Sequence, residues 1–142
     1  LHDALPISEA LEKAVRSDTG VFFDNARIQE TYFNLGAAAM KQKRYDRAAE
    51  SFRKVIEAVP TNIDAKRNLG LSLHMQGRSA EGIRELEETI RKFPNSAESY
   101  NTLGLIFADR GQKQEAAANF QKALSINPNF VQAQANLRKL NE

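Results

Sequence analysis

Few side chains in this sequence are placed to do chemistry. The chain has no cysteine and only two histidines, His2 and His74, so neither histidine has partners to complete a metal site. No serine stands in a recognised arrangement with a histidine, and the glycines are scattered singly instead of forming a phosphate-binding loop. We therefore expect no catalytic residue, no metal and no cofactor, and we interpret His74 as a packed or solvent-facing residue.

An acidic run at Glu85, Glu87 and Glu88 offers carboxylates, but the bases Arg84, Arg91 and Lys92 flank it. Opposite charges three or four positions apart pair along the surface of a helix. Acid–base catalysis needs two carboxylates that face each other across a substrate instead. The run is therefore predicted to be a solvated helix face.

A basic cluster could bind nucleic acid, and the chain has one at Lys41, Lys43, Arg44 and Arg47. Nucleic-acid binding favours basic residues that recur along one face with aromatic residues between them. The matching stretch two intervals later, 109–113, is mixed in charge, and the formal net charge of the chain is only +2. We do not expect nucleic acid to be a partner.

The strongest signal is a repeat whose landmarks recur every 34 residues. A Leu-Gly pair, a large apolar residue and a proline keep this interval, at Leu35-Gly36, Leu69-Gly70 and Leu103-Gly104, at Phe52, Leu86 and Phe120, and at Pro60, Pro94 and Pro128. A fixed interval of this length indicates stacked copies of a small unit that cannot bury its own apolar face alone.

Each unit contains two amphipathic helices. In the first unit the apolar residues recur at helical spacing in two runs, Tyr32, Leu35, Ala39 and Met40, then Tyr45, Ala48, Phe52, Val55 and Ile56. Pro60 ends the second run, because proline lacks an N–H and clashes with the preceding turn. Gly77 is placed to end the first helix of the second unit with a positive φ, and Gly111 stands at the matching turn of the third unit. The glycines of the Leu-Gly pairs predict that a neighbouring helix passes too close for a larger side chain.

The fold class that follows is all-α, a helix-turn-helix repeat solenoid. We place its parts at residues 29–62, 63–96 and 97–130 for three repeats, and at 131–142 for a C-terminal capping helix. Residues 9–28 are interpreted as part of a preceding helix and a connector. No stretch approaches the roughly 20 apolar residues that a membrane span needs.

The first residues look foreign to the fold. Residues 1–7, Leu-His-Asp-Ala-Leu-Pro-Ile, read as the in-frame translation of a common sequencing-adapter oligonucleotide. We treat 1–8 as an adapter-like segment and exclude it from fold reasoning; the alternative is a natural segment that leads into a helix. On this interpretation the natural N-terminus, with any signal peptide, anchor or catalytic domain, is missing.

The repeat resembles the tetratricopeptide repeat family, which pairs antiparallel helices in units of this length. The first copy carries the motif residues Tyr32, Leu35, Gly36, Ala48, Phe52 and Pro60, and the third carries Tyr100, Leu103, Gly104, Gly111, Ala116, Phe120, Ala123 and Pro128. The second departs more, with Lys66 for the first aromatic, Gly82 for alanine and Thr89 for a small apolar residue. The resemblance covers the chain from Gln29 to its end.

The resemblance implies a concave groove, lined by the first helices, that receives an extended peptide or a partner helix. Mapping by position in the repeat assigns to this groove Phe33, Asn34, Met40, Arg67, Asn68, Leu71, His74, Asn101, Thr102, Leu105 and Asn136. Asn34, Asn68 and Asn136 share one position, with Thr102 completing the row, so the amides could hydrogen-bond a peptide backbone. This row is similar to the asparagine ladder in the repeat domain of O-linked N-acetylglucosamine transferases.

A related family function is not expected. Repeat domains that hold the C-terminal carboxylate of heat-shock chaperones need a set of Lys, Asn and Arg on these helices. Here the matching positions carry Phe33, Ala37, Glu98 and Thr102, and only Asn68 fits.

We therefore predict a non-catalytic protein–protein interaction scaffold with a protein or peptide partner. The alternative is the repeat domain of a larger enzyme, such as a glycosyltransferase, whose catalytic part lay upstream. The partner, the oligomeric state and the compartment, cytoplasm or periplasm, are not encoded visibly.

Overall fold

The structure, a computed structural model, describes residues 25–142. The adapter-like segment 1–8 and most of the segment 9–28 lie outside the described residues. The described elements are all helices: α2 (Asn25–Lys41), α3 (Tyr45–Ala58), α4 (Ile63–Met75), α5 (Ser79–Lys92), α6 (Ala97–Asp109), α7 (Lys113–Ile126) and α8 (Val131–Leu140). The predicted all-α class is confirmed for this part of the chain. Within it, no helix combines the length and apolarity that a bilayer crossing requires.

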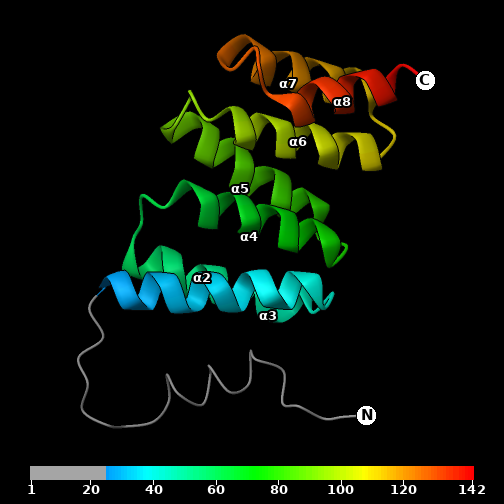
Figure 1. Ribbon diagram of the computed structural model, residues 1–142. Helices are drawn as coiled ribbons and strands as arrows, with labels where there is room; N and C mark the ends of the chain where they lie inside the picture. The colour runs from blue at the N-terminus through cyan, green and yellow to red at the C-terminus, as the bar shows by residue number, and fades with distance from the viewer. Residues whose placement is uncertain (1–24) are drawn as a thin grey trace, which may run out of the picture.

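The helices form a one-dimensional stack (Figure 1). Helices α2, α4, α6 and α8 run in one direction, and α3, α5 and α7 return antiparallel to them. Each helix contacts the next along the chain, and α6 also contacts α4 and α8. The predicted solenoid is confirmed, with α2 beginning at Asn25, before Gln29.

The second helix of each repeat ends at its proline. The residues that precede the prolines, Val59, Phe93 and Asn127, have φ of −136°, −130° and −130°, away from the α region. Steric clash with the proline ring disfavours the α conformation at this place. Two of the following first helices are then capped by polar side chains, because Asn62 Oδ1 accepts from Ala65 N at 2.8 Å and Ser96 Oγ accepts from Ser99 N at 3.3 Å.

The turn inside each repeat uses one residue with a positive φ. Gly77 has φ of 82° and Gly111 has φ of 74°, as the sequence predicts for Gly77. The first repeat has Lys43 at the same place, with φ of 58°. A left-handed conformation costs a residue with a Cβ about 1–2 kcal/mol. The first turn is therefore strained where the other two are not.

Glycines of the Leu-Gly pairs mark close helix crossings. A Cβ at Gly36 would lie 2.7 Å from the Phe52 ring, and a Cβ at Gly104 would lie 2.6 Å from the Phe120 ring. These distances are shorter than van der Waals contact, so a larger residue would displace the ring. The predicted reason for these glycines, a helix that passes too close for a side chain, is confirmed.

The hydrophobic core runs along the stack and joins each repeat to the next. One cluster spans α2, α3 and α4, a second joins Leu86 of α5 to Leu103 and Ile106 of α6, and a third joins Ala97, Ala123 and Ala133 of α6, α7 and α8. Helix α8 buries only Ala133 and leaves Val131 68% exposed. Helix α8 therefore packs on one side and faces solvent on the other.

Candidate functional site

The predicted groove residues all come from the same-direction helices. Phe33, Asn34 and Met40 lie on α2, Arg67, Asn68, Leu71 and His74 on α4, Asn101, Thr102 and Leu105 on α6, and Asn136 on α8. The structure separates them into residues that are open to a ligand and residues whose side chains already have an internal role.

The open residues are two amides and an apolar patch. Asn34 is exposed and Asn68 is half-buried, and neither side chain has a hydrogen-bond partner within residues 25–142. Leu71 is half-buried, Leu105 is 38% exposed, and Met75 is 42% exposed one helical turn after Leu71. Apolar side chains beside unpaired amides can bind both the side chains and the backbone of a peptide.

Phe33 and Met40 are committed to packing in the first repeat. The Phe33 ring meets the Phe52 ring edge-to-face, with centroids 5.5 Å apart and an interplanar angle of 70°. Both Phe33 and Met40 pack against the first core cluster. Their apolar surface is therefore largely used inside the array.

The C-terminal half of the polar row is also engaged. Asn136 Nδ2 donates to Asn101 Oδ1 at 2.9 Å, which ties α8 to α6. Thr102 Oγ1 donates to the carbonyl oxygen of Glu98 at 2.9 Å, within its own helix. Asn101 and Thr102 are buried. Of the four row positions, Asn34 and Asn68 are the ones whose side chains remain open.

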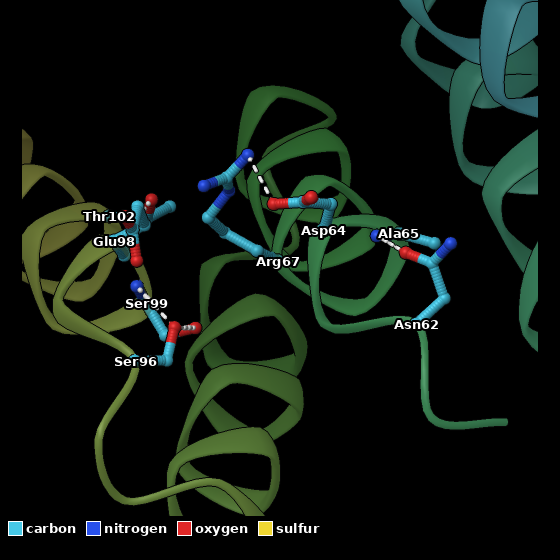
Figure 2. A network of polar contacts seen from close by, with 8 residues as sticks. All are labelled: Asn62, Asp64, Ala65, Arg67, Ser96, Glu98, Ser99 and Thr102. Carbon is cyan, nitrogen blue, oxygen red and sulfur yellow. Dashed lines mark hydrogen bonds and ion pairs between the residues drawn. The ribbon is translucent and has the colours of Figure 1, made fainter.

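Charged residues gather where α4 and α6 begin (Figure 2). Arg67 Nη2 pairs with Asp64 Oδ1 at 3.1 Å, and the guanidinium is more buried than the carboxylate. In the view of Figure 2, Arg67 extends from α4 toward the side of Glu98 and Thr102. No ion pair to the Glu98 carboxylate is found within the described residues. A cavity of about 580 Å³ at this edge is lined by Asp64 and Glu98, among others.

His74 joins three helices. Its Nδ1 lies 2.9 Å from Ser79 Oγ of α5, and its Nε2 lies 3.0 Å from Asp109 Oδ2 of α6. In acyl-transfer triads the serine contacts Nε2 and the carboxylate contacts Nδ1, the reverse of this arrangement. We interpret His74 as a tie between the second and third repeats, which is the packed one of the two roles expected from the sequence, packed or solvent-facing.

One carboxylate of the acidic run on α5, Glu88, pairs with a base, as the sequence predicts for this run. Lys92 Nζ lies 2.9 Å from Glu88 Oε1, four residues away, and this hydrogen bond lowers the pKa of the Glu88 carboxyl. Arg78 holds both oxygens of Glu81 and lowers the pKa of that carboxyl in the same way. In the described part of the chain, no group of three His, Asp or Glu side chains is arranged to hold a metal.

Sequence reasoning missed one feature of the site. A cavity of about 300 Å³ lies between α6, α7 and α8, and its lining includes Leu105, Ala108, Phe120 and Asn136. Two of these residues, Leu105 and Asn136, are on the predicted list, but the cavity also depends on how far α8 stands from α6. The available signal was the small residue Ala108 at a position where the earlier repeats carry larger side chains.

Solved structures share this fold. YrrB, described as a TPR protein with an unusual peptide-binding site, is 18% identical with a TM-score of 0.74, covering 92% of this chain and 64% of that one. MamA is 26% identical with a TM-score of 0.71, covering 94% and 74%. The second TPR domain of human RPAP3, in complex with an HSP70 peptide, is 19% identical with a TM-score of 0.69, covering 83% and 98%.

Sequence comparisons assign the family. Comparison with curated proteins finds no match. Tetratricopeptide repeat models match residues 29–62, 64–96 and 97–130, which together make up most of the chain. The three ranges fall on the helix pairs α2–α3, α4–α5 and α6–α7. The chain belongs to the tetratricopeptide repeat family.

Proposed function

We propose that this chain is a non-catalytic scaffold that binds a peptide or a partner helix on the face formed by α2, α4, α6 and α8. One observation carries the proposal. Leu71, Met75 and Leu105 leave apolar surface open on α4 and α6, and the amides of Asn34 and Asn68, which have no partner among residues 25–142, stand on the same series of helices. A folded protein otherwise has no packing use for such a patch.

The structural neighbours support this class of partner. Human RPAP3 holds an HSP70 peptide on the same fold, and YrrB is described as having a peptide-binding site. The ligand chemistry is expected to differ from that of a carboxylate clamp. Glu98 would place a negative charge beside a bound carboxylate, and the neighbouring Thr102 is buried and bonded within its helix.

The test begins with peptides selected from a random display library on the purified chain, with affinity measured by fluorescence anisotropy. Leu71→Glu should abolish binding, because it places a charge in the apolar patch while α4 stays helical by circular dichroism. Asn68→Ala should weaken binding by about 1–3 kcal/mol, the cost of losing an amide partner to a peptide group.

The control lies on the other layer of helices. Glu87 is exposed on α5, and Glu87→Ala should leave affinity unchanged. Peptides that bind Leu71→Glu as tightly as the unaltered chain would place the binding surface elsewhere and refute the proposal.

A further inference from the structure

The first two gaps between the first helices of successive repeats hold one side chain each, from the same repeat position. In the first gap this residue is Met40, which packs against a cluster that includes Leu69 and Leu73 of α4. Its sulfur also accepts a hydrogen bond from Ser72 Oγ at 3.2 Å. Met40 therefore closes the space between α2 and α4.

In the second gap the residue 34 positions later is His74. Its ring bridges Ser79 and Asp109 at 2.9 and 3.0 Å, and its side chain is largely buried. His74 fills the space between α4 and α6 at their C-terminal ends, at the repeat position that Met40 has one repeat earlier.

In the third gap the same position carries Ala108, and the space stays open. The cavity of about 300 Å³ described above lies here, with Leu105, Phe120 and Leu140 in its apolar lining. We call it the Ala108 cavity. A buried apolar cavity of about 150 Å³ is large enough to bind benzene. The Ala108 cavity therefore has room for one leucine, methionine or phenylalanine side chain.

The edge of the Ala108 cavity carries two lysines without ion-pair partners in the described part of the chain. Lys113 and Lys139 both line it. The Asp109 carboxylate, which also lines it, is held by His74, and Glu142 is the remaining acid. An acidic group next to the inserted side chain would complement these ammonium groups.

We propose that the Ala108 cavity receives one large apolar side chain of a partner peptide, with an acidic residue next to it that pairs with Lys113 or Lys139. This inference rests on the proposed function, since it gives the bound peptide an anchor at the C-terminal end of the same helical face. In the third gap, the ligand side chain takes the place that Met40 and His74 occupy in the first two gaps.

The test uses two dipeptide probes, N-acetyl-Phe-Asp-amide and N-acetyl-Ala-Asp-amide, titrated into the isotope-labelled chain and followed by amide NMR shifts. The phenylalanine probe should shift the amides of Leu105, Asn136 and Leu140 in a saturable way, and the alanine probe should not. Shifts confined to other helices, or equal shifts with both probes, would overturn the proposal.

Ala108→Met fills the cavity with the residue that the first repeat uses, and it should weaken the phenylalanine probe at least tenfold. Ala118→Met is the matched control, because Ala118 is exposed on α7, and it should leave the probe affinity unchanged. Unaltered probe binding to Ala108→Met would refute the cavity as the site. Thermal unfolding checks that both variants fold, and Leu105→Ala gives a second test, because removing one wall should also weaken the probe.

Lys139→Glu tests the contribution of the ion pair to affinity separately from that of the inserted apolar side chain. It should weaken N-acetyl-Phe-Asp-amide several-fold and leave a neutral probe, N-acetyl-Phe-amide, unaffected. If Lys139→Glu lowers the affinity of both probes equally, the proposed pairing of an acidic ligand residue with this lysine is refuted.

The display-selected peptides distinguish this inference from the proposed function. If Leu71→Glu abolishes their binding while Ala108→Met has no effect on either them or the phenylalanine probe, the scaffold function stands and the cavity proposal fails. If Ala108→Met blocks the probe and Leu71→Glu spares the peptides, the cavity stands and the proposed groove fails.

Discussion

Gly82 of α5 lies so close to the carbonyl oxygen of Gly70 on α4 that a Cβ at Gly82 would overlap that oxygen. Repeats one and three have alanine at the corresponding place, Ala48 and Ala116, and both are fully buried. The second repeat therefore brings two backbones together at a crossing where the other repeats accommodate a methyl group.

Gly82→Ala should destabilise the chain, although it restores the alanine that the other repeats use. In a helix interior, alanine is more stabilising than glycine by about 0.5–1 kcal/mol. The added methyl group, however, must push α5 away from a backbone oxygen that cannot move alone. Overpacking of this kind costs about 1–3 kcal/mol, so we expect a net loss of about 1 kcal/mol in chemical denaturation. A gain in stability would show that α4 and α5 separate without cost.

Lys43→Gly should stabilise the first repeat. Lys43 holds φ of 58°, whereas the matching residues Gly77 and Gly111 carry no Cβ. Glycine removes the cost of holding a residue with a Cβ in the left-handed conformation, about 1–2 kcal/mol. The greater conformational freedom of glycine in the unfolded chain offsets about 0.4–1 kcal/mol of that gain in stability. The thermal midpoint should rise accordingly. The reverse change, Gly77→Lys, should lower it, and a fall with Lys43→Gly would contradict the assigned turn.

Leu103→Ala should cost about 2–5 kcal/mol, as truncations of buried leucines do. Leu103 is 5% exposed and packs with Leu86 and Ile106 across the junction of the second and third repeats. Because each repeat contacts only its neighbours, hydrogen exchange should accelerate first in α6, α7 and α8. Opening that began in α2 would contradict a linear array.

The fold could be predicted from the sequence because its signals are local and repeated. Pro60 ends a helix by its own covalent structure, and Gly77 takes a positive φ that its missing Cβ allows. The proline recurs three times and the turn glycine twice at one interval, and this repetition removes the ambiguity that a single copy would leave. The strained turn at Lys43 was not predicted, because the neighbouring helices force a lysine into a conformation that its own preference disfavours.

The site was predicted less completely because position in a repeat does not decide what a side chain contacts. Phe33 occupies a groove position, yet its ring packs on Phe52. Asn101 and Asn136 come from helices that meet only in the folded array, so their hydrogen bond has no signature in either local sequence. The Ala108 cavity depends on the spacing of α6 and α8, which repeat spacing alone does not give.

Two asparagines at the same repeat position should behave differently when truncated. Asn136 donates to the buried Asn101 across α6 and α8, whereas Asn34 is exposed and has no partner within residues 25–142. Asn136→Ala should cost about 1–3 kcal/mol in chemical denaturation, because the Asn101 amide oxygen is left buried without its donor. Hydrogen exchange should show this loss concentrated in α8.

Asn34→Ala should leave the free energy of unfolding within about 0.5 kcal/mol of the unaltered chain, as surface substitutions usually do. Its effect should appear in the affinity for display-selected peptides, since its amide is open to a ligand.

The Asn101→Ala, Asn136→Ala double variant should recover part of the stability lost in Asn136→Ala, because no buried amide is then left unpaired. A double variant that loses the sum of the two single losses would show that the two amides stabilise the cap independently of each other.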